Sequence, residues 1–246
     1  MLFFKTKKIP LTDLFTDHYV DIHSHLLPGI DDGAKDLDQS IELIREMASY
    51  GMVNFITTPH VLGDVYPNSS ATIKEKLALV REELTKRNLT DININAGAEY
   101  MLDEQFSKLL EKDDLLPLKD HYLLVEMSYF NAPINLYEVL FQIQLKGYIP
   151  ILAHPERYNF YHDNFEHYYK LKKAGCLFQL NLLSLTEQYG KNVKKISQKL
   201  LANKLYDFVG TDAHHMQHVT LLKEIGTKKI KEQIAPLLKN NTKFWP

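Results

Sequence analysis

The chain contains few cysteine and arginine residues, and this limits the kinds of catalytic and binding site that it can form. Cys176 is the only cysteine among 246 residues, so an internal disulfide, a Cys-based zinc site and a redox pair of thiols are excluded. It stands in an apolar run, which indicates a small buried hydrophobe. The only arginines are Arg45, Arg81, Arg87 and Arg157. The places where a guanidinium could bind a ligand are therefore few.

The chain also lacks long hydrophobic runs and a strong net charge. No window approaches the roughly 20 apolar residues of a transmembrane helix. The first eight residues have neither the apolar core nor the cleavage site of a secretory signal, so we expect a cytoplasmic protein. The formal net charge of -2 gives no indication of a nucleic-acid partner. With 45% hydrophobic and 24% charged residues, the composition is that of a globular protein.

Several common catalytic signatures are missing as well. The sequence has no G-x-x-x-x-G-K-[ST] loop, no G-x-G-x-x-G fingerprint and no G-x-S-x-G elbow. Cys176 lies inside a predicted strand and lacks the loop and following arginine that a cysteine phosphatase would need. The chemistry must therefore come from other residue types.

The chain does contain a regular alternation of apolar runs and helical patterns. Strands are predicted at 19–22, 53–58, 91–96, 122–125, 149–153, 176–180 and 206–209. Helices are predicted at 37–50, 71–88, 103–111, 135–146, 164–174 and 193–203, with a loop at 61–70, Ser70 as a helix cap, and one or two helices after residue 214. This alternation favours parallel βα units in a single α/β domain, residues 19–246. Residues 1–18 would form an N-terminal extension with one helical turn at 11–15.

Six of the seven apolar runs end in side chains that can bind a metal ion. These are His23 with His25, His60, Glu99, Glu126, His154, and Asp212 with His214. Any one of them alone is more simply explained as a loop residue or a hydrogen-bonding group. His23 and His25 stand two residues apart, however, so on an extended strand both imidazoles point to the same side. In a closed parallel barrel all C-terminal strand ends face one mouth, where these donors would converge.

The donor types indicate which metals such a site would hold. Imidazole and carboxylate without thiolate suit zinc, manganese or iron. With Asp32 included there are nine candidates, and because one tetrahedral metal uses about four ligands, nine imply two or three metal ions. Clustered divalent metals are typical of phosphoester hydrolysis, in which they lower the pKa of a bound water and neutralise developing charge.

A cation and several aromatic residues also follow predicted strand ends. Arg157 comes three residues after His154 and could bind a phosphate with two parallel hydrogen bonds; the alternative is a surface ion pair with Glu156. Four aromatic residues could line a pocket for an aromatic group, although rim or core positions explain them equally well; they are Tyr66, Tyr129, Phe130 and Tyr158. A surface role is expected for His215 and His218.

Taken together, these motifs resemble a known family. The segments are Asp-Ile-His-Ser-His at 21–25, Pro-Gly-Ile-Asp-Asp-Gly at 28–33, Thr-Pro-His at 58–60, Gly-Ala-Glu-Tyr at 97–100, Ala-His-Pro-Glu-Arg-Tyr at 153–158 and Thr-Asp-Ala-His at 211–214. They are similar to those of the polymerase-and-histidinol-phosphatase (PHP) superfamily, and most similar to the bacterial tyrosine-protein phosphatases of capsule and exopolysaccharide systems, the CpsB/CapC/YwqE type. The resemblance covers residues 19–214.

The resemblance implies a distorted TIM-like (β/α)7 barrel with a trinuclear site, often manganese-dependent. His23, His25, Glu99 and Asp212 would hold one metal. Glu99 would bridge to a second metal, shared with Glu126 and His154, while Asp32, His60 and His214 would hold the third. Arg157 matches the phosphate-binding arginine, and Asp31 is expected to shape the loop. Many relatives carry another arginine shortly after the Asp-Ala-His motif, but here no arginine follows Arg157.

The resulting hypothesis is a metal-dependent protein-tyrosine phosphatase, linked to capsule or exopolysaccharide regulation, in which a metal-activated hydroxide attacks phosphorus. Arg157, Tyr66 and Tyr158 would contact the substrate, a phosphotyrosine protein such as a bacterial tyrosine kinase. Manganese is the expected metal, with iron and zinc as alternatives. Two other functions stay open: a histidinol-phosphatase-like phosphomonoesterase or a phosphodiesterase, and a non-catalytic metal-binding regulator of a polysaccharide assembly kinase. The oligomeric state is not predicted.

Overall fold

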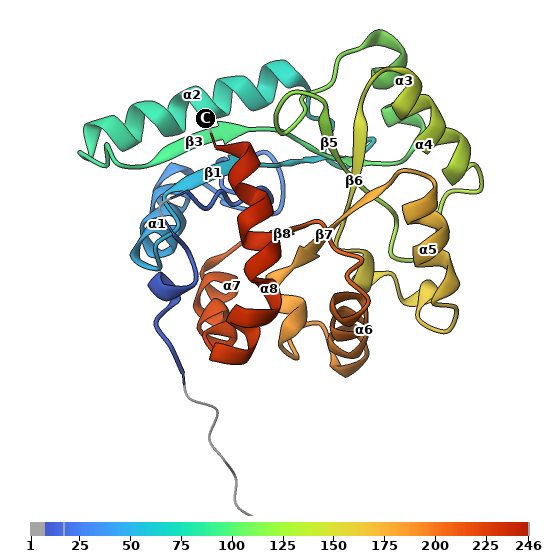
Figure 1. The fold of residues 1–246 in the computed structure, drawn as a ribbon. Helices are drawn as coiled ribbons and strands as arrows, with labels where there is room; N and C mark the ends of the chain where they lie inside the picture. The colour runs from blue at the N-terminus through green and yellow to red at the C-terminus, as the bar shows by residue number, and fades with distance from the viewer. Residues whose placement is uncertain (1–7, 17, 246) are drawn as a thin grey trace, which may run out of the picture.

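The computed structural model describes residues 8–16 and 18–245, and it shows a mixed α/β fold built on parallel strands (Figure 1). A two-stranded sheet has the order β1-β3, and a six-stranded sheet has the order β2-β4-β5-β6-β7-β8. The strands are β1 (Asn54–Thr57), β2 (His60–Val61), β3 (Asn93–Ala96), β4 (Glu99–Met101), β5 (Tyr122–Glu126), β6 (Ile149–Ala153), β7 (Leu177–Asn181) and β8 (Phe208–Gly210). All pairings within the two sheets are parallel, as the alternating pattern predicts.

Helices surround the strands, and most bounds agree with the predicted ranges to within two residues (Figure 1). They are α1 (Leu37–Ser49), α2 (Ser70–Lys86), α3 (Glu104–Lys112), α4 (Leu136–Leu145), α5 (Glu166–Lys173), α6 (Lys191–Ala202), α7 (Met216–Leu221) and α8 (Lys228–Asn241). Short 3-10 turns are η1 (Leu11–Asp13), η2 (Pro155–Arg157), η3 (Asn159–Tyr161), η4 (Leu182–Leu185), η5 (Leu222–Ile225) and η6 (Thr242–Phe244). No helix in the described part of the chain is long and apolar enough to cross a membrane.

Two local predictions need correction. Ser69, not Ser70, caps α2, because its hydroxyl accepts the amide hydrogen of Thr72 in a capping box. The predicted loop at 61–70 begins one residue later, because Val61 belongs to β2 and pairs with Tyr100.

The predicted first strand at 19–22 is extended chain that makes only single bridges. On one side, the Asp21 amide donates to Asn54 at 2.9 Å and the Ile56 amide donates back to Asp21 at 2.8 Å. On the other side, Asp212 donates to the His23 carbonyl at 2.7 Å and His25 donates to the Ala213 carbonyl at 2.9 Å. The segment makes one bridge on each side, Asp21 with Phe55 and Ser24 with Ala213, so no continuous ladder forms. This pairing also places His23 and His25 directly beside Asp212.

The described part of the predicted N-terminal extension packs on the main body. The η1 turn lies where a helical turn was predicted, and Leu11, Leu14 and Phe15 are buried. A Cβ atom at Gly51 would lie 2.9 Å from the Phe15 carbonyl oxygen, which shows how closely this segment approaches the end of α1. Residues 1–7, with Lys5 and Lys7, lie outside the described residues.

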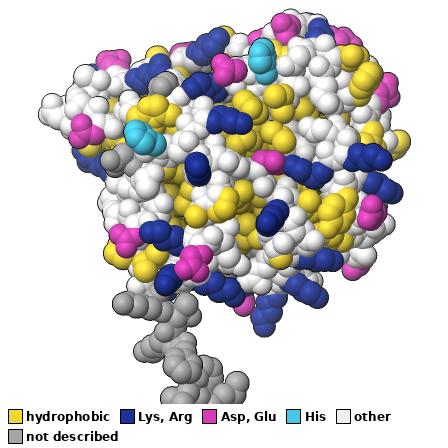
Figure 2. All heavy atoms as spheres, viewed as in Figure 1, with side chains coloured by type: hydrophobic (Ala, Val, Ile, Leu, Met, Phe, Trp, Pro, Cys, Tyr) yellow, Lys and Arg dark blue, Asp and Glu magenta, His cyan; other side chains and the backbone are white. Residues whose placement is uncertain are grey.

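Helix α8 closes the end of the sheet at which the strands begin. The buried Asn241 amide donates to the carbonyls of Val20 and Val209, each at 2.8 Å. Phe244 then packs against Tyr122 and Phe208, the first residues of β5 and β8. In Figures 1 and 2 this face lies toward the viewer, with lysine and arginine side chains scattered among hydrophobic ones. The opposite end, where the strands finish, is left for the functional site.

Candidate metal centre

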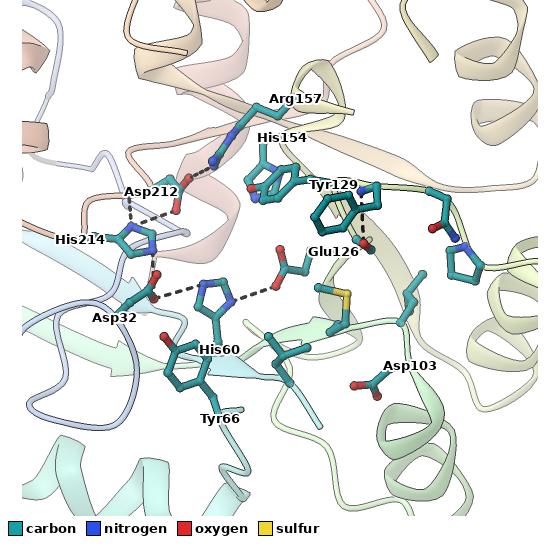
Figure 3. Close-up of a pocket in the computed structure, with 17 residues that line it drawn as sticks. Asp32, His60, Tyr66, Asp103, Glu126, Tyr129, His154, Arg157, Asp212 and His214 are labelled. Atoms are coloured by element: carbon teal, nitrogen blue, oxygen red, sulfur yellow. Dashed lines mark hydrogen bonds and ion pairs between the residues drawn. The ribbon is translucent and has the colours of Figure 1, made fainter. Parts of the chain in front are cut away.

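The nine donor side chains predicted from the sequence gather at the C-terminal ends of the strands. His60 and Glu99 come three residues after β1 and β3 end, Glu126 ends β5, and His154 follows β6. Four overlapping groups have ligand atoms within 4.8 Å of one another: His25, Asp32, His60 and His214; His23, His154 and Asp212; His23, His25 and Glu99; His60, Glu99 and Glu126. Figure 3 shows six of the nine at one pocket, with dashed contacts that run from Asp212 through His214, Asp32 and His60 to Glu126.

Glu99 occupies the middle of this cluster. Its Oε2 atom lies 3.1 Å from His23 Nε2 and 3.2 Å from His60 Nδ1. Its Oε1 atom lies 3.0 Å from His154 Nε2. A fully buried carboxylate with an imidazole against each oxygen has the geometry of a bridging ligand.

Several buried donor atoms make no hydrogen bond of acceptable geometry, although three of them lie within 3.3 Å of another ligand atom. They are His60 Nδ1, Glu99 Oε2, His154 Nδ1 and Asp212 Oδ1. Polar atoms buried in proteins are nearly always paired, so four orphans in one cluster need an explanation. A divalent cation supplies it, because these are imidazole nitrogens and carboxylate oxygens, the donors that zinc, manganese and iron bind. The residues present therefore fit a metal centre.

The electrostatics agree with a site for cations. Burial raises the pKa of Glu99 and of Asp212, but the neighbouring basic groups together outweigh it: His23 and His60 at Glu99, and His23, His214 and Arg157 at Asp212. The pKa of each carboxyl group therefore falls well below its usual value, so both groups stay anionic at neutral pH. Burial also lowers the pKa of His214 to about 4, helped by the charge of His25, which favours the neutral imidazole that binds a metal. Glu99 and Glu126, by contrast, overcome burial and raise the pKa of His60 to about 9, so His60 must lose a proton when a metal binds.

The grouping differs in one respect from the arrangement that the resemblance implies. His60 Nδ1 lies 3.0 Å from Glu126 Oε1, which brings His60 rather than His154 beside Glu126. His154 instead groups with His23 and Asp212, although it still contacts Glu99.

Two histidines are oriented by partners in the surrounding shell. His23 Nδ1 lies 2.9 Å from Gln179 Oε1, and His25 Nδ1 lies 2.8 Å from Asp31 Oδ2. These contacts leave both Nε2 atoms directed into the cluster, 3.4 Å apart. Burial alone would raise the pKa of Asp31, but His25 and the Gly33 amide lower it to about 2. Asp31 thus both shapes the loop, as predicted, and orients a candidate ligand.

Gln179 was missed by the sequence analysis, although a signal was present. It is a polar residue inside the apolar run of β7 and is fully buried. A Cβ atom at Gly210 would lie 2.6 Å from His23 Cβ and 2.7 Å from Gln179 Nε2. Glycine at 210 is therefore required for the approach of His23 and Gln179.

Two candidate ligands have a backbone conformation that is rare outside glycine. His154 has φ 35° and Asp212 has φ 51°, both in the left-handed region. Such conformations cost of order 1–3 kcal/mol and cluster at functional sites. Here they turn each side chain toward the cluster directly after its strand.

Arg157 lies at the edge of the cluster between two aromatic rings. Its Nη1 donates to Asp212 Oδ2 at 2.7 Å, and its guanidinium carbon stands 4.8 Å from the Tyr129 ring and 4.2 Å from the Tyr189 ring. The alternative ion pair with Glu156 does not form. Glu156 is buried and accepts hydrogen bonds from the Asn181 amide at 3.0 Å and the Tyr206 hydroxyl at 2.9 Å.

A second layer of polar residues supports this arginine. The Asn181 side chain donates to Asp212 Oδ2 at 2.7 Å and to the Tyr189 hydroxyl at 3.2 Å. Asn181 and Tyr189 were not singled out from the sequence, because neither has a motif of its own. Their role depends on contacts between β7, the chain after it and the chain after β8.

The cluster opens into a pocket of about 560 Å³. Arg157, Tyr66, Tyr129 and Phe130 line it together with six of the donors (Figure 3). The structure corrects the expectation for Tyr158, whose side chain is fully buried. Its hydroxyl accepts a hydrogen bond from Met127 and donates one to Ala153, so it supports the pocket wall from behind. His218 contacts His214 and Tyr189, while Cys176 is a free, buried thiol as predicted.

Comparisons with known proteins agree with this geometry. The family described as "Capsular polysaccharide synthesis, CpsB/CapC" matches residues 19–236. The tyrosine-protein phosphatase YwqE of Bacillus subtilis is 34% identical, over 92% of this chain and 93% of its own. The putative tyrosine-protein phosphatase CapC of Staphylococcus aureus is 30% identical, over 90% and 89%.

Solved structures give the same relationship. A crystal structure from the study of YwqE and of CpsB from Streptococcus pneumoniae, described as unique metal-dependent tyrosine phosphatases, superposes with a TM-score of 0.76 at 33% identity, covering 90% of this chain and 94% of that one. A histidinol phosphate phosphatase of Lactococcus lactis shares the fold at 14% identity, with a TM-score of 0.53 over 85% and 94% of the two chains. The chain therefore belongs to the CpsB/CapC family of capsular polysaccharide synthesis proteins.

Proposed function

We propose that this protein is a metal-dependent protein-tyrosine phosphatase that hydrolyses phosphotyrosine in proteins. The observation that carries the proposal is the convergence of nine imidazole and carboxylate donors, four of their buried atoms unpaired, beside an arginine at the mouth of one pocket. The two relatives compared by sequence are named as tyrosine-protein phosphatases, CapC only as a putative one, which supports the same substrate class.

The donor residues would hold two or three divalent ions, with manganese expected and iron or zinc as alternatives. When bound, such ions lower the pKa of a water ligand and polarise phosphoryl oxygens. Glu99 would bridge two ions from the centre of the cluster, because both of its oxygens already face imidazoles. Gln179 and Asp31 would hold His23 and His25 in the ligating orientation.

Arg157 would bind the phosphoryl group. A guanidinium has five N–H donors, and the bond to Asp212 uses one of them. Tyr129 and Tyr189 flank the guanidinium and keep its plane oriented, so the remaining donors can stabilise the charge that develops on the phosphoryl oxygens.

The pocket also suits an aromatic leaving group. Apolar and aromatic side chains line it beside the donors, among them Leu62, Tyr66, Met101 and Phe130. A tyrosine phenolate has a pKa near 10, so it leaves with less protonation than an alkoxide needs. Hydrolysis of a phosphotyrosine ester therefore requires no strong general acid from this chain.

The architecture is consistent with the proposed chemistry. We interpret the two parallel sheets and the segment at 19–25 as one distorted seven-stranded barrel, in which β1 with β2 and β3 with β4 each count as one interrupted strand. The segment at 19–25 would close this barrel, because it hydrogen-bonds both to β1 and to the chain after β8. Residues 8–16 would be a packed extension. A bacterial tyrosine kinase of a capsule or exopolysaccharide system is the proposed substrate, and the cytoplasm is where we expect the two to meet.

The decisive experiment combines metal analysis with a substrate comparison. The purified protein would be stripped of metal, reloaded separately with manganese, iron and zinc, and assayed on a phosphotyrosine peptide, histidinol phosphate and a phosphodiester. We expect metal-dependent turnover, with the phosphotyrosine peptide hydrolysed fastest. A preference for histidinol phosphate or the diester would reassign the substrate. Metal binding without turnover of any phosphoester would instead support a regulator.

A further inference from the structure

A strip of surface next to the pocket is nearly free of charge. Residues 127–145 contain one charged side chain, Glu138, in a chain that is 24% charged overall. In the described part of the chain nine large hydrophobic side chains are exposed. Six of the nine lie in this strip: Tyr129, Phe130, Ile134, Tyr137, Phe141 and Leu145. Apolar side chains gathered in this way mark interaction sites more often than scattered ones do.

The six side chains form a row that starts at the pocket. Tyr129 and Phe130 line the pocket mouth, and Phe130 is 90% exposed. Ile134 follows in the loop before α4 and is fully exposed. Along α4 the row continues through Tyr137, Phe141 and Leu145, which are spaced by four and so share one face of the helix. The ten residues of α4 extend about 15 Å, which gives the length of the row beyond the rim.

The opposite face of α4 accounts for the fold without help from this row. Leu136, Val139, Leu140 and Ile143 are buried against the body of the protein. The exposed apolar row is therefore not needed to hold α4 in place, and its exposure to water is unfavourable in proportion to its apolar area. A partner that covers the row would recover that free energy.

Two occupants fit poorly. A second copy of this chain seated along the whole row would cover Tyr129 and Phe130 and so close the pocket mouth that these residues line. A membrane surface attracts segments rich in lysine and arginine, but the only charge in the strip is the anionic Glu138. A polypeptide whose phosphotyrosine occupies the pocket, by contrast, can leave the pocket along this row, because Tyr129 and Phe130 belong to the pocket lining.

We propose that the row formed by Phe130, Ile134, Tyr137, Phe141 and Leu145 is the docking surface for the polypeptide that carries the phosphotyrosine. This inference rests on the proposed function and refines its substrate class to sequences with apolar residues flanking the phosphotyrosine. An extended chain rises about 3.3 Å per residue, so about five flanking residues span the part of the row that lies on α4. Apolar side chains among those five pack on Ile134 and Phe141.

The test compares three substrates with two variants. The substrates are free phosphotyrosine, a phosphopeptide with apolar residues at the five positions on each side, and the same peptide with serine at those positions. The double variant Ile134→Ser with Phe141→Ser removes the middle of the row without touching the pocket lining. Leu79→Ser, which removes an exposed leucine of α2, is the matched control.

We expect the unaltered protein to hydrolyse the apolar peptide with kcat/KM about tenfold above that for the serine peptide, mainly through KM. The double variant should remove this preference, whereas Leu79→Ser should keep it. Turnover of free phosphotyrosine with no difference between the peptides would overturn the docking surface and leave the proposed function intact. Failure to hydrolyse any phosphotyrosine compound while histidinol phosphate or a diester is turned over would overturn both. A fall in molecular mass of the double variant in solution would assign the row to contact between copies instead.

Discussion

The pocket has two unlike walls. The donor wall consists of the nine candidate ligands with Arg157, and six of its ligands are buried to 2% exposure or less. The other part of the lining, the aromatic rim, consists of Tyr66, Tyr129 and Phe130, of which Phe130 is 90% exposed. Donor side chains are held by further hydrogen bonds, whereas the rim follows strand ends as exposed loop. The residues that need an exact position for catalysis thus belong to the rigid donor wall. The exposed aromatic rim is where we expect substrates to be distinguished.

The largest effect is expected when two candidate ligands of the donor wall are removed at once. His23→Ala with His25→Ala should lower kcat by more than about 1,000-fold on every phosphoester, because the loss of ligands exceeds the 10–100-fold effect of supporting residues. Metal content measured by elemental analysis should fall in parallel, and the far-ultraviolet circular dichroism should stay that of an α/β protein. Full activity in this variant would refute the metal centre.

A substitution of Arg157 tests whether catalysis needs a guanidinium beside the candidate metal ligands. Arg157→Lys keeps the positive charge but loses the planar fork and its stacking between Tyr129 and Tyr189, so kcat/KM should fall by about 100-fold while metal content is retained. Arg45→Lys, at an exposed position of α1, is the matched control and should behave as the unaltered protein. Full activity in Arg157→Lys would mean that the positive charge suffices and that the planar fork and its stacking contribute nothing.

Gln179 tests whether the rigidity of the donor wall comes from the shell around it. Gln179→Leu removes the acceptor for His23 Nδ1, which lies 2.9 Å away, so metal affinity should fall 10–100-fold. Excess metal should restore turnover, and Gln179→Glu should retain most of the affinity because it keeps an acceptor. Gln198→Leu, at an exposed position of α6, controls for the apolar substitution. Unchanged metal affinity in Gln179→Leu would show that His23 needs no support.

The two walls also differ in how far the sequence predicts them. Eight of the nine donors follow from strand alternation, because parallel strands bring their C-terminal ends together whatever lies between them, whereas Asp32 comes from the loop after His25. Tyr129 and Tyr158 both follow strand ends, yet only Tyr129 lines the pocket. The η2 turn directs Tyr158 inward, where its hydroxyl bonds to Met127 and Ala153, and no local pattern encodes that choice.

Supporting residues were harder to predict for a related reason. Gln179 contacts a residue 156 positions away, and its role exists only once β7 stands beside His23. The segment at 19–25 likewise has the pattern of an ordinary strand. The alternation does not show that the segment makes only one bridge on each side. Local periodicity thus predicts which elements form, while long-range contacts decide how each donor is held.

The smallest effect is expected for a substitution of Tyr66 in the aromatic rim, which tests whether this residue contacts the substrate or supports a donor. The Tyr66 ring stacks over His60 with centroids 5.8 Å apart and lines the pocket, so it can also contact the ring of a phosphotyrosine. Tyr66→Leu should raise KM for free phosphotyrosine about threefold, consistent with 0.5–1.5 kcal/mol for an aromatic pair, while kcat stays within about twofold. Tyr66→Phe should match the unaltered protein, because the ring rather than the hydroxyl makes the contact. Steady-state kinetics on free phosphotyrosine and on an alkyl phosphate separate the two effects. An equal change on both substrates would mean that Tyr66 supports His60, so that this residue belongs to the donor wall instead.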